Sequence, residues 1–245
     1  VSRAIATMQE SIRLSELAKF VVPQAYTRAD LAALYGDLGA VKLGLETAQL
    51  ALSFAETHVP MVRTHCLGVM AKLHLLEGNV TDAEIAVRAA HNAPTQDVWP
   101  DHFVPVPLAD SELALVQGDH ERALKVTDEL LSQLREFGMR SYYPYVLYLQ
   151  GQALLGLGRE QDARQSFIES RAEAEAIGSR RVQWRALLAL SQIEPDPAAA
   201  ERLRGTARQV IDMIARHIDQ DDLRQSFLER SDVRLLFERT DASDG

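Results

Sequence analysis

Seven histidines are the side chains of this 245-residue chain most suited to metal or acid–base chemistry. None of them shows an HExxH or comparable metal-ligand spacing. Two of them, His65 and His74, stand nine residues apart, which puts them on different faces of a helix. We therefore expect a structural role for each histidine and predict no metal site; the seven are His58, His65, His74, His91, His102, His120 and His217.

The other reactive groups are equally isolated. Cys66 has no His–Asp partner arranged near it in sequence, so we interpret it as a small buried hydrophobe. Asp221 and Asp222 stand at a polar helix start, where a solvated cap is expected. The run Gly36–Gly39 lacks the lysine and the preceding strand that a phosphate loop needs. The sequence thus predicts neither catalysis nor a cofactor. The rival hypothesis is a hydrolase that uses His102 or His65 as its base.

Two aromatic groupings are candidates for binding rather than catalysis. In the first, a tyrosine cluster opens one predicted helix and a cationic stretch opens the next comparable one, so together they would make an aromatic–cationic patch. The alternative is that the aromatic rings are packing residues with a polar edge. The members are Tyr142, Tyr143, Tyr145, Tyr148, Arg180, Arg181 and Trp184.

The second grouping lies in the longest predicted connection, residues 94–107, which contains Trp99 and His102. Long connections often carry function, so these two residues are candidate ligand contacts. The alternative is an insertion that Trp99 pins to the surface.

Composition indicates which elements must hold these residues. Ala and Leu dominate the chain, and both lose little side-chain entropy in a helix. Strand-like runs of β-branched residues are nearly absent. The net charge of −9 argues against nucleic acid as a partner, and no apolar run reaches the length of a membrane span. With a single cysteine, the expected compartment is the cytoplasm.

An internal repeat organises the helices. Turn glycines recur in steps of 39, 40 and 40 residues, and each is followed five residues later by a small residue. Seven residues before each glycine there is again a small residue. Such a pattern predicts two antiparallel helices that approach closely, with the glycine in the left-handed conformation that ends the first helix. The glycines are Gly39, Gly78, Gly118 and Gly158, and the flanking small residues are Ala32, Gly44, Ala71, Ala83, Ser111, Ala123, Gly151 and Ala163.

The small–x6–Gly–x4–Ala spacing resembles the core of the tetratricopeptide repeat (TPR), with Gly151, Gly158, Ala163 and Phe167 matching best. The resemblance implies an all-α fold, a right-handed α-α superhelix (solenoid) of antiparallel helix pairs. Asp110 and Gln150 depart from it, since the family prefers leucine there. The period near 40 also exceeds the family's usual 34. Long repeats of this kind resemble those of large bacterial ATPase and cyclase-type regulators.

We expect TPR-like repeats over residues 1–217, as pairs 24–58, 60–93, 103–138, 141–178 and 180–217. Residues 1–22 would be the second helix of an incomplete pair, or alternatively a free-standing cap helix. Residues 218–239 are predicted to form capping helices, which lay apolar side chains over the last pair, and residues 240–245 a disordered tail. The apolar set expected to cover that pair is Leu223, Phe227, Leu228, Leu235 and Phe237.

The sequence therefore favours a non-catalytic interaction or effector-sensing domain of a larger cytoplasmic signalling or transcription regulator. Its expected partner is a protein or peptide, with a small effector as another option, and neither nucleic acid nor membrane is expected. The alternatives are a structural spacer or a dimerisation module, in which the chain forms a homodimer.

Overall fold

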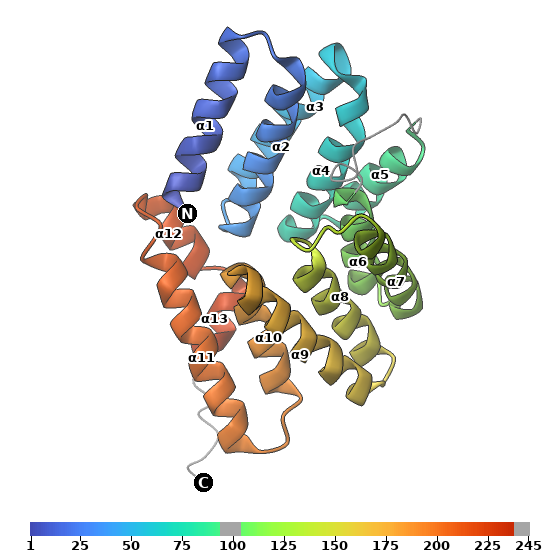
Figure 1. Cartoon of the computed structure of the whole chain (residues 1–245), viewed down its shortest axis with the longest axis vertical. Helices are drawn as coiled ribbons and strands as arrows, with labels where there is room; N and C mark the ends of the chain where they lie inside the picture. Colours follow the sequence, from blue (N-terminus) through green and yellow to red (C-terminus); the bar gives the residue numbers. More distant parts are fainter. Residues whose placement is uncertain (94–103, 238–245) are drawn as a thin grey trace. The chain divides into compact units, whose positions relative to one another are not determined.

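The computed structural model describes residues 1–93 and 104–237. Within these ranges the chain consists of helices joined by short turns, and they contain no strand (Figure 1). The chain divides into two compact units, Val1–Arg140 and Ser141–Gly245, and each is described by itself.

The first unit is a series of consecutive helices in which each packs against the next along the chain. Two further contacts skip one helix, so that α2, α4 and α6 also pack side by side. We call these the first helices of their pairs, and α3, α5 and α7 the second helices. The bounds are α1 Ser2–Leu17, α2 Val21–Asp37, α3 Val41–His58, the short 3₁₀ helix η1 Pro60–Val62, α4 Arg63–Glu77, α5 Val80–His91, α6 Pro105–Val116 and α7 His120–Glu136.

The second unit continues the same arrangement. Its first helices α8 and α10 contact each other, while α9 packs against both and α11 packs against α10. Two short helices then contact α11. The bounds are α8 Tyr143–Gly156, α9 Glu160–Ile177, α10 Arg180–Gln192, α11 Pro197–Ala215, α12 Asp221–Leu228 and α13 Ser231–Phe237.

Glycines in the left-handed conformation end helices in both units, as the sequence predicts. Gly39, Gly78, Gly118 and Gly158 all have positive φ, between 73° and 85°. After α4, for example, the Asn79 N–H donates to the carbonyl of His74 at 2.8 Å, which satisfies a terminal carbonyl of the helix. The turn between α10 and α11, at residues 193–196, has no glycine. There, Asp196 caps α11 by accepting from the N–H groups of Ala198 and Ala199.

The small residues allow the close approach that the repeat pattern predicts. Ala83, Ala123 and Ala163 are each fully buried. At Gly151 the fit is tightest, because a Cβ placed there would lie 2.4 Å from the Phe167 ring of the neighbouring helix. The all-α fold of antiparallel helix pairs thus rests on contacts that a larger side chain would break.

Asp110 and Gln150 stand at the two positions where the tetratricopeptide family prefers leucine, and both form hydrogen bonds with polar residues of neighbouring helices. The Asp110 carboxylate, which is almost buried, accepts hydrogen bonds from Arg122 of α7 and from His91 of α5 at 3.2 Å. The Gln150 side chain accepts from the Ser166 hydroxyl of α9 at 3.0 Å. A buried carboxylate needs such partners, so Asp110 joins three helices where leucine would fill space.

The C-terminal helices cover α11 with a different set of side chains from the predicted one. Phe227 is buried as expected, but the other buried apolar residues are Val233 and Leu236. Leu228, Leu235 and Phe237 remain between 38% and 57% exposed, so their predicted burial is wrong. The Arg208 guanidinium fixes the register, because it donates to the carbonyl of Leu236 at the end of α13. The predicted tail at residues 240–245 lies outside the described residues.

Candidate binding surface on the first helices

The starts of α8 and α10 bring two parts of the predicted aromatic–cationic patch together. The Arg181 guanidinium lies over the Tyr145 ring, with 5.1 Å between its central carbon and the ring centroid. The Tyr145 ring stacks in turn on Tyr148, with centroids 6.0 Å apart and planes within 12°. A cation over a tyrosine face is attracted by the quadrupole of the ring. The geometry therefore joins a cationic group of α10 to an aromatic pair of α8.

Two side chains of α9 contact the first turn of α8 and the Tyr148 ring. The Ser170 hydroxyl donates to the Pro144 carbonyl at 2.6 Å, in the first turn of α8. The Phe167 ring lies 6.0 Å from the ring of Tyr148. Because Phe167 and Ser170 are both fully buried, they fix the start of α8 as a rigid platform.

Trp184 does not belong to an exposed patch. Its side chain is only 1% exposed and lies among the largest fully buried side chains of the described residues. The Arg185 guanidinium covers it, 4.8 Å from a ring centroid, and donates to the Arg181 carbonyl at 2.9 Å. The prediction of Trp184 as a partner contact is therefore wrong, because the ring faces the core of the second unit. Tyr145, at 9% exposed, also contributes mainly packing.

What remains accessible at this surface is cationic and phenolic. Arg180 is exposed, while Arg181, Tyr142, Tyr143 and Tyr148 are half-buried. The first turn of α10 contains no acidic residue, and its N-cap, Ser179, makes no side-chain cap hydrogen bond. The positive end of the helix dipole thus coincides with two arginines rather than with acids. An anionic group would be attracted to this point.

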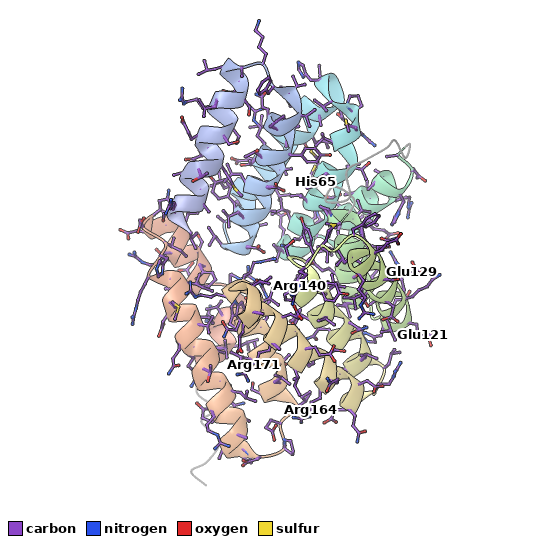
Figure 2. All side chains as sticks on the ribbon, viewed as in Figure 1. His65, Glu121, Glu129, Arg140, Arg164 and Arg171 are labelled. Atoms are coloured by element: carbon purple, nitrogen blue, oxygen red, sulfur yellow. The ribbon has the colours of Figure 1, made fainter. Side chains whose placement is uncertain are left out.

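A second set of contacts, which the sequence analysis missed, links the first helices of the first unit. His65, labelled in Figure 2, lies on α4. Its Nε2 lies 3.0 Å from a carboxylate oxygen of Asp30, and the Tyr26 ring meets the His65 ring edge-on at 5.0 Å. Further along the same helices, the Lys72 ammonium donates to Asp37 at 2.8 Å. Both polar pairs are separated by 35 residues, which is the repeat less one helical turn. That spacing is the signal that could have revealed them.

The same cluster disfavours the thiolate form of Cys66. Burial raises the pKa of its thiol to about 12, and the nearby Asp30 carboxylate adds to the shift. Burial likewise raises the pKa of the Tyr26 hydroxyl well above its ordinary range. Both groups stay protonated at neutral pH, whereas nucleophilic attack by cysteine needs the thiolate. His65 is 5% exposed, which gives a substrate no access to the ring that the hydrolase hypothesis invokes.

Trp99 and His102, the candidates in the connection between α5 and α6, lie outside the described residues. Residues 1–93 and 104–237 contain no group of three or more His, Cys, Asp or Glu side chains arranged to hold a metal ion. In that part of the chain, none of the helices has both the length and the apolar character that crossing a bilayer requires.

Comparisons with known proteins identify the fold. No family model matches the chain, and no curated protein matches it in sequence. Among solved structures, BtubC (BKLC) from P. vanneervenii is similar with a TM-score of 0.55 and 18% identity, covering 81% of this chain and 84% of that one. A crystal structure of nearly identical TPR-like repeats, assigned to a Podosopora anserina kinesin light chain, gives a TM-score of 0.51 at 13% identity, covering 79% and 97%. The predicted all-α, TPR-like solenoid is therefore confirmed as a fold.

Proposed function

We propose that this chain is a non-catalytic interaction module that binds an acidic peptide segment of a partner protein at the starts of α8 and α10. The observation that carries the proposal is the Arg181 guanidinium held on the Tyr145 ring, with the exposed Arg180 beside it. The first turn of α10 contains no acidic residue of its own, and the nearby Glu175 of α9 accepts a hydrogen bond from Gln183. Arginine presents a planar set of donors that matches a carboxylate, and tyrosine supplies rigid contact area.

The two arginines have different roles in this proposal. Arg180 makes no ion pair with another described residue, so its guanidinium is available to a carboxylate of the peptide. Arg181 is half-buried on Tyr145, which fixes the direction of its donors. A peptide with one acid beside an apolar or aromatic residue fits this arrangement, since the half-buried Tyr142 and Tyr148 offer ring surface nearby.

The wider role follows from the fold. Helix repeats present the starts of successive first helices along one surface, which suits extended partners. Together with the absence of a nucleophile among the reactive groups described above, this favours the interaction domain of a larger cytoplasmic signalling or transcription regulator. A small carboxylate effector uses the same chemistry as the acidic peptide, and the experiment distinguishes the two.

The test is a selection of displayed 12-residue peptides against the full chain, followed by calorimetry with the enriched peptides. We expect enrichment of acidic peptides whose binding is weakened about tenfold or more by Arg180→Glu and by Arg181→Glu. Arg216→Glu is the matched control, because Arg216 is an exposed arginine of the same unit, at the end of α11.

The proposal fails if no peptide is enriched, or if the three variants weaken binding equally, as a general charge effect would. Binding of free succinate or glutamate at the affinity of the best peptide, with the same loss in Arg180→Glu, would instead assign the surface to a small effector.

A further inference from the structure

The start of α10, where the proposed peptide site lies, is connected to the C-terminal helix α13 by charged side chains. The Arg185 guanidinium donates to the Arg181 carbonyl at 2.9 Å, in the first turn of α10. The Nε of the same guanidinium lies 3.8 Å from a carboxylate oxygen of Asp232, in the first turn of α13. Arg185 therefore contacts both the backbone of the site and a carboxylate of the C-terminal helix.

Arg185 is a nearly buried cation. Its side chain is 10% exposed, and its central carbon lies 4.8 Å from a centroid of the Trp184 ring system. A guanidinium in such a place is stable only where hydrogen bonds and negative charge compensate for the lost water. The Asp232 carboxylate supplies part of that negative charge, so it favours the position of Arg185 against Trp184 and the Arg181 carbonyl.

The Asp232 carboxylate is itself oriented by Arg230. The Arg230 guanidinium, whose side chain is 9% exposed, donates to both oxygens of that carboxylate at 3.0 and 2.7 Å. A contact at two points fixes the direction of a carboxylate as well as its place. Burial alone would raise the pKa of Asp232, but hydrogen bonds and charge from Arg230, with the charge of Arg185, hold that pKa below its ordinary value. The group is therefore ionised at neutral pH.

We propose that Asp232 is a positioning residue for the peptide site, which acts through Arg185 on the first turn of α10 and thereby on the Arg181 guanidinium. This inference rests on the proposed function, because it concerns how the binding arginine is held. The first turn of α10 needs support, since its N-cap, Ser179, makes no side-chain cap hydrogen bond. Helix α13 then regulates the site, because any partner that displaces α13 removes this support and weakens peptide binding.

The sign of the effect distinguishes positioning from simple electrostatics. The peptide is acidic, so a carboxylate that acted only through its charge would repel it, and removing that charge would tighten binding. Positioning predicts weaker binding, because the apparent affinity falls with the fraction of molecules that have Arg181 in place. We expect Asp232→Asn to weaken the binding of an enriched acidic peptide about fivefold in calorimetry with the full chain.

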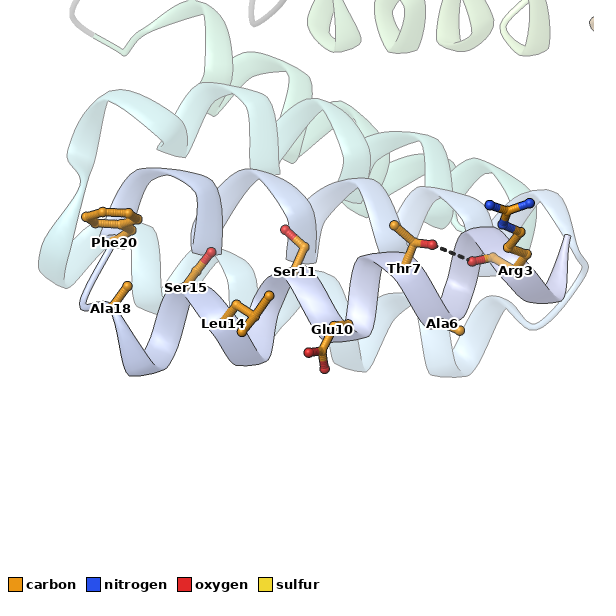
Figure 3. A pocket seen from close by; sticks show the side chains of 9 residues that line it. All are labelled: Arg3, Ala6, Thr7, Glu10, Ser11, Leu14, Ser15, Ala18 and Phe20. Carbon is orange, nitrogen blue, oxygen red and sulfur yellow. Dashed lines mark hydrogen bonds between the residues drawn. The ribbon is translucent and has the colours of Figure 1, made fainter.

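The peptides used in this comparison must bind at the start of α10. The first unit also has an open apolar groove of about 700 Å³, whose lining residues all come from the segment Arg3–Phe20 (Figure 3). Leu14 in this groove is 50% exposed, so it is available to an apolar peptide. Only peptides whose affinity is unchanged by Leu14→Glu therefore enter the comparison.

Two matched variants separate positioning from charge and from folding. Asp222→Asn removes an exposed acid of α12 that makes no ion pair with another described residue, and it should leave binding unchanged or slightly tighter. Asp232→Glu keeps a carboxylate and should restore most of the affinity that Asp232→Asn loses. The buried Val233 and Leu236 still hold α13 in these variants, and unfolding followed by circular dichroism shows whether the second unit stays folded.

A double-mutant cycle tests whether Asp232 acts through Arg181. Arg181→Ala removes the guanidinium that is to be positioned, so adding Asp232→Asn should then change the affinity by less than about twofold. Equal effects of Asp232→Asn in the two backgrounds would overturn the proposal. Unchanged or tighter peptide binding in Asp232→Asn itself would overturn it as well.

A measurement without peptide separates failure of this inference from failure of the proposed function. The Arg181 guanidinium lies 5.1 Å from the Tyr145 ring centroid, so the ring shifts the NMR signal of its Nε–H group away from that of an exposed arginine such as Arg216. Arg181→Ala identifies the signal by removing it. Asp232→Asn should move the signal most of the way to the exposed value, and Asp222→Asn should leave it in place.

The two failures then give different results. If no peptide is enriched, the proposed function fails, while a shifted signal in Asp232→Asn still shows that α13 positions Arg181. A signal that stays in place in Asp232→Asn overturns the inference, even where acidic peptides bind to the parent chain.

Discussion

The contact between α4 and α6 makes a sharp test of the packing, because Gly68 has no room for a side chain. A Cβ at this position would lie 2.7 Å from the Pro105 carbonyl carbon, 2.8 Å from the Pro105 Cβ and 2.8 Å from the Val106 nitrogen. Nonbonded carbons prefer a separation of about 3.5–4.0 Å. Gly68→Ala therefore requires the two helices to separate by about 0.8 Å, since backbone and ring atoms cannot rotate away as a side chain would.

The magnitude follows from two opposing effects. Overpacking a close contact costs about 1–3 kcal/mol, and a collision with backbone belongs to the upper end of that range. Alanine in a helix interior stabilises the helix by about 1 kcal/mol relative to glycine. We expect Gly68→Ala to lower the free energy of unfolding by about 2 kcal/mol. The corresponding fall in the melting temperature is about 5–10 °C for a unit of this size.

Gly205→Ala is the matched control. Gly205 also lies inside a helix, α11, but a Cβ there would meet nothing within 4 Å. This substitution should therefore stabilise its unit by up to about 1 kcal/mol. Thermal and urea unfolding followed by circular dichroism measures both variants against the parent chain. If Gly68→Ala were as stable as the parent while Gly205→Ala gained stability, α4 and α6 could not approach as closely as described.

Three further predictions concern single groups. Lys19→Gly should raise the free energy of unfolding by about 1 kcal/mol in a urea titration, because glycine accepts the positive φ without strain; an unchanged midpoint would show that the turn is not strained. The Cys66 thiol, with its pKa raised to about 12, should react with a disulfide reagent at pH 8 only as the first unit unfolds, and rapid reaction of the native chain would contradict its burial. Burial alone would raise the pKa of Asp232, but hydrogen bonds and charge from Arg230, together with the charge of Arg185, lower it overall. A depressed folded pKa gives stability that is present above the unfolded pKa of about 3.9 and is lost as the pH falls through the folded value. The protection factors of the α13 amides against hydrogen exchange should therefore fall in that acidic range, and Asp232→Asn should remove this dependence on pH.

The repeat was predictable because it depends on residue types at fixed spacings, which can be read directly from the sequence. A glycine that ends a helix and small residues at fixed distances on either side specify a close antiparallel pair, whatever the rest of the chain does. Gly78 and Ala83 illustrate this, since both have the conformation or burial that the period requires.

Exposure was less predictable, because it depends on which neighbouring helix covers a given face. Trp184 and Arg181 stand three residues apart at the start of the same helix, yet one is buried in the core and the other reaches the Tyr145 ring. In the short helix α13, a shift of one residue rotates the side chain by about 100°, so Leu236 is buried where Leu235 was expected. Helical periodicity predicts which residues share a face of a helix, but not which neighbouring helix that face packs against.

The contacts between first helices were missed for a related reason. Asp30 and His65 do not stand out as single polar residues. Their contact becomes evident only when positions separated by one repeat less one helical turn, which is 35 residues, are compared. The pairing of Tyr145 with Arg181 follows the same principle, since both stand at the start of successive first helices. Comparing equivalent positions of consecutive repeats should therefore reveal polar contacts that no single motif contains.

The proposed peptide surface follows from how a helix repeat uses its own faces. Each pair buries one face against the next pair, so binding is left to helix starts. The start of α10 carries cationic groups where acids would be electrostatically better. Arg180→Glu should therefore stabilise the second unit slightly in a urea titration while it weakens peptide binding. A variant that lost stability together with peptide binding would mean that Arg180 supports the fold rather than the partner.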